Sequence, residues 1–323
     1  MKAAIQCAAA YVPAREVTND DLSRLVDTTD EWIATRTGIR RRRVSTGENT
    51  SDMAFAVCEQ IFAKSGLKPA DIDLLIVATV TADYATPSVA CMVQGRLGAE
   101  NAIAFDVNAA CTGFLYALSI AEKYIAAGAC RNAIIVGAET LSKQVDWTER
   151  STCVLFGDGA GGVLLTQAAR GGILGESIRA DGRQFTAIRG GHRPAVSPFA
   201  AEEQKEAFLQ MDGRALFDFT TREVPKSIRG LLEKAGIDAA DVSFFLLHQA
   251  NERIVSAIAK KLGIEYTRFP ININDKGNTS SASVPILLAE LADSGKITFG
   301  SGERLVLAAF GGGLTWGSMI IQI

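Results

Sequence analysis

The sequence of 323 residues lacks long apolar runs and an excess of positive charge, and each lack excludes a class of protein. No segment reaches the roughly 18 continuous apolar residues of a membrane span. The apolar run in the first residues, MKAAIQCAAAYVP, is too short for a signal peptide. The formal net charge of −3 argues against general nucleic-acid binding, so any attraction for acidic partners must be local. We therefore expect a cytoplasmic protein that binds neither membranes nor nucleic acids.

Cysteine and histidine are scarce and widely spaced. The six cysteines include no C-x-x-C pair, which favours free thiols in a reducing compartment. Of the two histidines, His192 lies in the loop-like segment RGGHRPAVSP. His248 instead follows four apolar residues at the C-terminal end of a predicted strand, where α/β proteins build their active sites. At that position a histidine is either a hydrogen-bonded core residue or a functional one.

Hydrophobic residues make up 48% of the chain, and they follow strand and helix patterns in turn, such as a helix over 51–64 and a buried strand over 74–78. Cys111 lies at one junction, after an apolar strand over 104–107 and before a helix with one apolar face over 114–125. A thiol in the first turn of a helix is near unpaired N–H groups and the positive end of the dipole, so we expect a lowered pKa. The alternative is a buried cysteine that only packs.

The second half of the sequence repeats the pattern of the first. KAGIDAADVSFFLLHQ (234–249) aligns with KSGLKPADIDLLIVAT (64–79), and later elements match at offsets near 165 to 173 residues. We infer an internal duplication with halves 1–170 and 171–323, each predicted to form a mostly parallel sheet covered by helices. Two such halves meet in pseudo-two-fold fashion, so the ends of equivalent elements come together at the central interface.

Three residues at or near predicted strand ends should project into this interface: Cys111, His248 and Asn278. They supply a thiol, an imidazole and a neutral amide, with no carboxylate near them in sequence. A thiol exchanges acyl groups with another thioester, while a neutral imidazole and an amide can donate hydrogen bonds to a developing enolate oxygen. A hydrolase would more often need an acid that orients the histidine.

Three further segments have less specific patterns. The glycines of GGGLTWG (311–317) either let backbone N–H groups approach a ligand, as in an oxyanion hole, or form a tight turn. FGDGAGG (156–162) lacks the ending of a phosphate loop, so we interpret it as a structural turn. The four arginines 40–43 are interpreted as a solvated face, with binding of a phosphate-bearing ligand as the alternative.

Six motifs occur in order over nearly the whole chain: DEWIATRTGI (30–39), DVNAACTGF (106–114), FGDGAG (156–161), HQANERI (248–254), GNTSSASVP (277–285) and AFGGGLTWGS (309–318). They resemble the motifs of the β-ketoacyl-[acyl-carrier-protein] synthase III family. The resemblance implies an α/β, thiolase-like fold, with two βαβαβαββ halves in αβαβα layers and a homodimer. It also implies condensation of a short acyl-CoA primer with malonyl-[acyl-carrier protein], which initiates type II fatty-acid biosynthesis without a metal or prosthetic group.

The resemblance further assigns roles to single residues. Cys111 is implied to be the nucleophile, with His248 and Asn278 as donors to the malonyl thioester oxygen. The backbone N–H groups of Cys111 and Gly312 resemble the family's oxyanion hole. Thr86 resembles a primer-pocket residue that is contributed across the dimer interface, and its small side chain favours primers longer than acetyl.

Other positions resemble the residues that bind substrates in this family. Those for CoA and pantetheine are Trp32, Arg36, Arg150, Gly213, Phe217 and Asn251. For the acidic carrier protein we predict a docking surface at Gln249, Ala250, Asn251, Glu252, Arg253, Lys260 and Lys261, because its cationic residues share one predicted helix face. Arg214 and Asp218 depart from the Asn and Lys of well-known members. Two alternatives stay open: a thiolase-fold synthase of specialised metabolism with another acceptor, and a catalytically inactive carrier-binding subunit.

Overall fold

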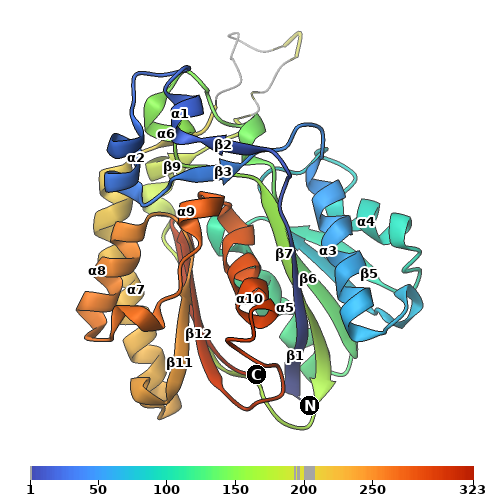
Figure 1. Ribbon diagram of the computed structural model, residues 1–323. Coiled ribbons are helices and arrows are strands. Elements are labelled where there is room, and N and C mark those ends of the chain that lie inside the picture. The colour runs from blue at the N-terminus through green and yellow to red at the C-terminus, as the bar shows by residue number, and fades with distance from the viewer. Residues whose placement is uncertain (1, 193, 195–196, 200–207) are drawn as a thin grey trace.

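The computed structural model describes residues 2–192, 194, 197–199 and 208–323. Two β-sheets lie side by side with two helices between them, and further helices cover the outer face of each sheet (Figure 1). The layers across the molecule are therefore helix, sheet, helix, sheet and helix. This arrangement confirms the predicted α/β class and its αβαβα layering.

The first sheet is built from the first half of the chain. Its strands lie in the order β1 (Lys2–Tyr11), β7 (Gly159–Ala168), β6 (Asn132–Glu139), β4 (Leu74–Ala78) and β5 (Ile103–Val107). β4 runs parallel to β5 and β6, whereas β7 runs antiparallel to β6 and β1. β1, β4, β5 and β6 therefore run in one direction, as the prediction of a mostly parallel sheet expects, and β7 alone runs the opposite way. The connection from β6 to β7, residues 140–158, carries only short helical segments and lacks the long crossover helix that usually joins parallel strands.

The second sheet repeats most of the first. Its strands lie in the order β11 (Val242–Leu247), β12 (Arg304–Gly311), β13 (Thr315–Gln322) and β8 (Gly172–Ala180). β11 runs parallel to β12, and β13 runs antiparallel to both β12 and β8, so the four strands correspond in direction to β4, β6, β7 and β1 of the first sheet. A counterpart of β5 is missing, since the described segment 269–272 is not a strand. That segment contains Pro270, which cannot donate a ladder hydrogen bond. One strand of the predicted βαβαβαββ pattern is therefore absent from this described half.

The long helices form three layers (Figure 1). α3 (Thr50–Ser65) and α4 (Val89–Leu97) cover the first sheet, and α7 (Gly213–Ala235) and α8 (Glu252–Leu262) cover the second. α5 (Gly113–Ala126) and α10 (Ser283–Asp293) lie between the sheets. α3 and β4 confirm the helix predicted over 51–64 and the strand predicted over 74–78. No helix in the described ranges is long and apolar enough to cross a membrane.

Short elements connect these layers, and many gather at the upper end of the molecule in Figure 1. The short helices and strands are α1 (Asn19–Leu22), α2 (Asp30–Thr37), α6 (Arg150–Cys153), α9 (Ile273–Lys276), β2 (Glu16–Thr18), β3 (Arg41–Arg43), β9 (Ile188–Arg189) and β10 (Gln210–Met211). The 3-10 helices are η1 (Pro69–Asp71), η2 (Ala110–Thr112), η3 (Leu141–Lys143), η4 (Gly182–Ala187), η5 (Ala239–Asp241), η6 (Tyr266–Arg268) and η7 (Ser280–Ala282).

The arginine run is only partly the solvated face that its sequence predicts, since Arg40 and Arg41 are exposed but Arg42 is not. Arg42 of β3 is fully buried, and its guanidinium donates to Asn19 Oδ1 and to the carbonyl of Val154, both at 2.8 Å. Burial lowers the pKa of Arg42 to about 10. Alternation along β3 explains the difference, because neighbouring residues of a strand point to opposite faces.

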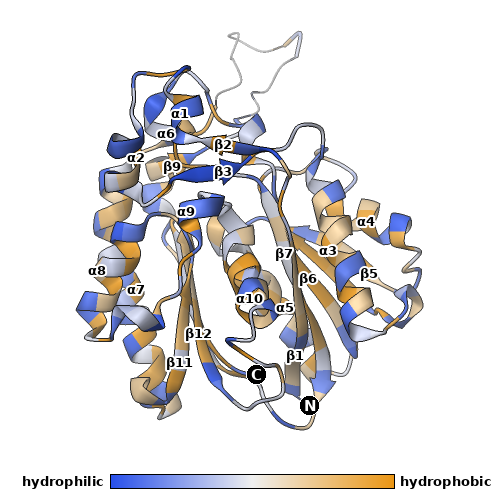
Figure 2. Cartoon of the chain, viewed as in Figure 1, coloured by the Kyte–Doolittle hydropathy of each residue, from blue (hydrophilic) through white to orange (hydrophobic). Residues whose placement is uncertain are grey.

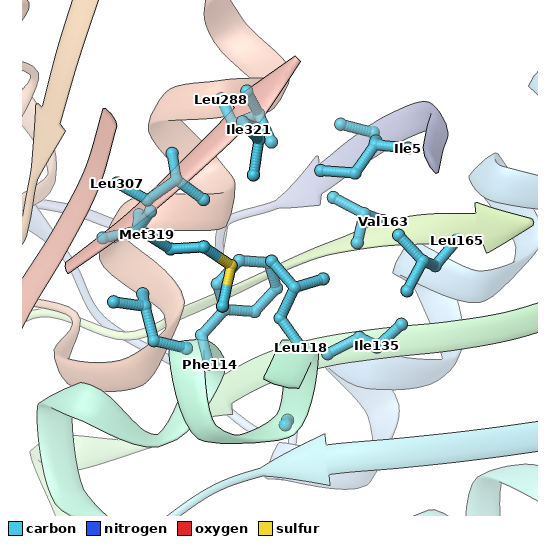
Figure 3. Packing of buried hydrophobic residues seen from close by; sticks show 14 of the residues in the cluster. Ile5, Phe114, Leu118, Ile135, Val163, Leu165, Leu288, Leu307, Met319 and Ile321 are labelled. Carbon is cyan, nitrogen blue, oxygen red and sulfur yellow. The ribbon is translucent and has the colours of Figure 1, made fainter. Parts of the chain in front are cut away.

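The main apolar core lies between the two sheets. Phe114 and Leu118 of α5 lie there near Leu307 and Met319 of the second sheet (Figure 3). Figure 2 shows hydrophobic colouring along β6, β12 and α10. Full burial of one such side chain contributes about 1.5–3 kcal/mol, so this shared core holds the halves together. Residues 169–171 separate β7 of the first sheet from β8 of the second.

Candidate active site

Two equivalent turns meet at the centre of the molecule, each just before a central helix. η2 precedes α5, η7 precedes α10, and the two turns contact each other. Ala110 and Ser280 have the same left-handed conformation, with φ of 47° and 49°. Such backbone is uncommon for residues with a side chain, so its repetition marks the turns as counterparts. This pairing brings Cys111 of the first half within a hydrogen bond of Ser280 in the second.

Cys111 is 7% exposed and packs against the end of β12. A Cβ atom at Gly311 would lie 2.8 Å from the Cys111 backbone nitrogen, so only glycine allows this approach. Burial raises the pKa of the Cys111 thiol to about 12, and the hydrogen bond with Ser280 acts in the opposite direction. The predicted lowering of this pKa is therefore not found, because removal from water disfavours the thiolate more than local hydrogen bonds favour it.

His248 directly follows β11 and is 1% exposed. Its ring meets the ring of Phe310 edge-on, with the two centroids 5.1 Å apart. Its Nδ1 lies 2.7 Å from the Oγ of Ser283, the first residue of α10. Burial lowers the pKa of His248 to about 3, so the imidazole is neutral at neutral pH. Phe310 immediately precedes Gly311, which links the surroundings of the histidine to those of Cys111.

Asn278 is buried just before η7. Its Oδ1 accepts a hydrogen bond from the Ser280 backbone N–H at 2.8 Å, which fixes the carbonyl end of the side-chain amide. The backbone N–H of Asn278 donates to the carbonyl of Leu155 at 2.8 Å and holds the main chain. Among the described residues none accepts a hydrogen bond from Nδ2, so the NH₂ group remains as a donor for a ligand. Ser280 thus connects Asn278 with Cys111.

A cavity of about 980 Å³ opens at Cys111. Ser280 and Gly312 share its wall, and a Cβ atom at Gly312 would lie 3.4 Å from the Cβ of Ala110. The glycine segment therefore runs beside the turn that carries the cysteine, and it is more than a connection between strands. Among the described residues, His248 and Asn278 are not part of the wall of this cavity.

Thr86 lies on the outside of this single chain. Its side chain is exposed and does not line the described wall of the cavity, whereas the neighbouring Tyr84 and Ala85 do. Within one chain the structure therefore does not bring Thr86 to Cys111. His192, which the sequence placed in a loop, lines the cavity.

A buried carboxylate that the sequence analysis did not single out lies next to these turns. Glu139 ends β6 and is fully buried. Its Oε2 accepts hydrogen bonds from Thr81 Oγ1 at 2.7 Å and from the Val80 N–H at 3.0 Å, and its Oε1 lies 2.8 Å from Ser281 Oγ. The signal in the sequence is the single acidic residue that closes the apolar strand NAIIVGAE.

The predicted CoA residues form two groups. Trp32 of α2 lies under the guanidinium carbons of Arg36 and Arg150, at 4.6 Å and 4.7 Å from the ring centroid. Asn251 joins this group, since its Nδ2 donates to the carbonyl of Arg36 at 3.1 Å. The second group, Gly213 and Phe217, lies in the first turns of α7, where Phe217 is exposed.

The residues proposed for carrier binding differ in exposure. Arg253, Lys260 and Lys261 are exposed on α8, and Lys261 Nζ donates to the carbonyl of Thr221 at 2.9 Å. Ala250 and Glu252 are half-buried. Gln249 is buried, and its side chain bonds the carbonyl of Leu247 and the N–H of Asn272.

Gln249 therefore cannot contact a carrier protein, and its place in that set was wrong. Sequence position alone did not reveal that the residue after His248 turns inward. Across the described residues, no group of three or more His, Cys, Asp or Glu side chains is placed to hold a metal ion.

Comparisons with known proteins concern the whole chain. Family models match as 3-oxoacyl-[acyl-carrier-protein (ACP)] synthase III over residues 105–182 and as its C terminal over residues 232–323. β-Ketoacyl-[acyl-carrier-protein] synthase III of Streptococcus mutans is 50% identical over 322 residues, which is 99% of each chain. The enzyme of that name from Streptococcus pneumoniae strain Hungary19A-6 is 47% identical over 321 residues, again 99% of each.

A solved structure agrees with the fold as well. The crystal structure of 3-oxoacyl-[acyl-carrier-protein] synthase III from Aquifex aeolicus VF5 superposes with a TM-score of 0.92 at 40% identity, over 99% of this chain and 100% of that one. The fold is the thiolase-like fold of condensing acyltransferases. The 50% sequence identity over the full length identifies the family more closely than the fold does. The chain belongs to the β-ketoacyl-[acyl-carrier-protein] synthase III family.

Membership settles the reaction as the condensation that initiates type II fatty-acid biosynthesis, catalysed by an acyltransferase. The comparisons favour neither a specialised-metabolite synthase nor an inactive subunit.

Proposed function

We propose that Cys111 carries the acyl group in this reaction. Its sulfur attacks the carbonyl carbon of acyl-CoA, the thioester bond to CoA breaks, and the thiol proton leaves with the CoA sulfur. The backbone N–H groups of Cys111 and Gly312 donate to the oxyanion of the tetrahedral intermediate. The cavity at Cys111 and the close approach of Gly311 support this, because they give a substrate carbonyl access to both backbones.

In the second half-reaction, His248 and Asn278 donate to the thioester oxygen of malonyl-[acyl-carrier protein]. Loss of CO2 leaves its electron pair on the enolate, which both donors stabilise. The enolate carbon attacks the acyl-Cys111 carbonyl, the thioester bond breaks, and the Cys111 thiolate takes up a proton. Decarboxylation supplies the carbanion, so no strong base is needed.

The observation that carries this proposal is the buried, neutral imidazole of His248. At a pKa of about 3 it is not protonated at neutral pH, so it cannot act as a cationic acid. A neutral ring can still donate one N–H, and Asn278 Nδ2 supplies a second donor. Two neutral donors stabilise an enolate oxygen without protonating it, which suits a carbanion that must attack carbon.

The proposed binding sites for CoA, pantetheine and the carrier protein lie at side chains on the surface. The adenine of CoA stacks at Trp32 between Arg36 and Arg150, and pantetheine passes Gly213, Phe217 and Asn251. The acidic carrier docks on α8 at Arg253, Lys260 and Lys261, with Ala250, Asn251 and Glu252 beside them.

We further propose a homodimer that forms along β5. This strand is at the edge of its sheet, and its Ile103 is 51% exposed, so a second copy would cover both. The enzyme needs no cofactor beyond its thioester substrates. It acts in the cytoplasm, where its six free cysteines stay reduced.

Intact-mass spectrometry after incubation with acyl-CoA, combined with a separate assay of malonyl decarboxylation, tests these roles. Cys111→Ser should form no acyl adduct, since a hydroxyl offers no thiolate. His248→Ala and Asn278→Ala should still acylate but lose decarboxylation and condensation.

Cys91→Ser is the matched control, because Cys91 is the exposed cysteine of the six. Acylation of Cys111→Ser at the wild-type level would refute the nucleophile. Loss of acylation in a folded His248→Ala variant would instead make His248 the base for the thiol.

A further inference from the structure

Ser283 is the first residue of α10, and its hydroxyl makes two contacts. The Oγ lies 2.7 Å from His248 Nδ1, and it accepts a hydrogen bond from the Gln249 backbone N–H at 3.4 Å. All three residues are buried, so water does not replace either contact. The Gln249 backbone is itself held in place, because its side chain bonds the carbonyl of Leu247 and the N–H of Asn272.

The single hydrogen of the Ser283 hydroxyl decides which partner donates in the bond between Ser283 and His248. A backbone N–H can only donate, so Ser283 Oγ accepts from Gln249 and keeps one hydrogen of its own. No third hydrogen-bond partner of this hydroxyl occurs in the part of the chain that the structure describes. If Nδ1 also donated, the hydroxyl hydrogen would be buried without an acceptor, which is unfavourable.

We propose that Ser283 is a positioning residue that holds His248 in one neutral tautomer, with Nδ1 as acceptor and the proton on Nε2. Which ring nitrogen carries the proton is set by the bond that the other nitrogen makes. The ring of Phe310 offers neither an acceptor nor a donor of comparable strength from its side.

This proposal rests on the proposed function and deepens it. A His248 with Nε2–H donates to the malonyl thioester oxygen, whereas the opposite tautomer would present a lone pair to it. The same lone pair is what a base for the Cys111 thiol would need. Ser283 therefore favours the second half-reaction and leaves the first without a histidine base.

The tautomer can be read directly in the resting enzyme, since the chain has two histidines. In the protein labelled with ¹⁵N-histidine, the signals absent from His248→Ala belong to His248. We expect a protonated Nε2 and an unprotonated Nδ1 in the wild type, and a shift toward the other tautomer in Ser283→Ala. A protonated Nδ1 in the wild type would overturn the proposal.

Kinetics supply the second measurement. Ser283→Ala should acylate within about twofold of the wild type, while kcat for decarboxylation and condensation falls about 10- to 100-fold. Ser283→Thr keeps the hydroxyl and should recover most of the loss. Ser294→Ala is the matched control, because its Oγ donates to the carbonyl of Leu291 at the other end of α10.

Unchanged decarboxylation in Ser283→Ala, or an equal loss in Ser294→Ala, would overturn the role of Ser283. Failure of the proposed function has a different signature. In that case His248→Ala itself retains decarboxylation, whatever tautomer the resting enzyme shows.

Discussion

Glu139 at the end of β6 and Ser281 in η7 are 142 residues apart in sequence, yet Ser281 Oγ lies 2.8 Å from Glu139 Oε1. The same Oγ lies 2.8 Å from the carbonyl oxygen of Ala78, which can only accept. Ser281 has one hydroxyl hydrogen, so when it donates to Ala78 the second bond requires a proton on Glu139. Burial raises the pKa of Glu139, which agrees with a neutral carboxylic acid at this junction between the halves.

Glu139→Gln should therefore be tolerated, because the amide keeps one donor toward Ser281 and one acceptor toward Thr81. We expect its unfolding free energy at pH 7 to lie within about 1 kcal/mol of the wild type. Glu139→Ala removes both and leaves buried donors unpaired, at a cost of about 2–4 kcal/mol. Urea unfolding followed by circular dichroism measures both variants at one protein concentration.

The pH dependence of the same variants has a defined sign. Because the folded-state pKa of Glu139 is raised, the native state binds more protons than the unfolded state between the two pKa values. Its contribution to stability is full below the ordinary pKa of about 4.3 and is lost as pH rises through the folded pKa. Stability of the wild type relative to Glu139→Gln should thus fall with rising pH. A difference that grows from pH 5 to pH 8 would contradict a neutral Glu139.

Alkylation of Cys111 tests which influence on its thiol dominates. With a pKa of about 12, the thiolate fraction at neutral pH is small and rises tenfold for each unit of pH. In a Cys91→Ser background, we expect the rate of Cys111 modification by iodoacetamide to increase about tenfold per unit from pH 7 to pH 9. A plateau below pH 8 would mean that the start of α5 outweighs burial.

The sequence predicts those parts of the fold that depend on local pattern. The duplication, the strand over 74–78 and the helix over 51–64 all rest on apolar spacing within a few turns or strands. Strand direction is not local, so the antiparallel β7 was missed. The inward turn of Gln249 was missed for the same reason, because its partner Asn272 is 23 residues away.

The candidate site divides in a similar way. Motifs predict Cys111, His248 and Asn278 as site residues, but they do not point to the groups that hold them. Ser283 reaches His248 across 35 residues. Glu139 and Ser281 are 142 residues apart in the chain. Contacts between residues so far apart produce no local pattern that a single sequence could show. The pKa of Cys111 depends on burial that only the packed halves create.

Charge reversal on α8 tests the proposed carrier surface. Arg253 is exposed in the first turn of α8, two turns before Lys260 and Lys261, so the three cations lie on one face. Arg253→Glu should raise KM for malonyl-[acyl-carrier protein] about tenfold and leave acylation by acyl-CoA almost unchanged. Initial rates at several carrier concentrations and two ionic strengths measure the change.

Lys68→Glu is the matched control for this surface. It makes the same change of charge at an exposed residue just before η1, which does not line the cavity. Equal carrier kinetics in Arg253→Glu and Lys68→Glu would move the interface to another face. A loss of acylation in Arg253→Glu would point to CoA binding as its role.

Primer length should depend on Thr86, which is exposed in one chain next to the cavity residues Tyr84 and Ala85. We expect this residue to close the primer pocket of the partner subunit in the proposed dimer. A threonine there leaves room that a phenylalanine would fill, and each buried methylene contributes up to roughly 0.8 kcal/mol. We expect the wild type to use four-carbon and branched primers, and Thr86→Phe to restrict it toward acetyl. Values of kcat/KM for acetyl-, butyryl-, isobutyryl- and hexanoyl-CoA measure the profile.

Thr86→Val separates pocket volume from other effects of the substitution, because valine has nearly the shape of threonine without its hydroxyl. We expect it to keep the wild-type length profile, since no buried polar partner of Thr86 is lost within the chain that the structure describes. Two results would remove Thr86 as the determinant of length. One is a wild type that rejects every primer above acetyl, and the other is an identical profile in Thr86→Phe, which would mean that neighbouring side chains refill the space.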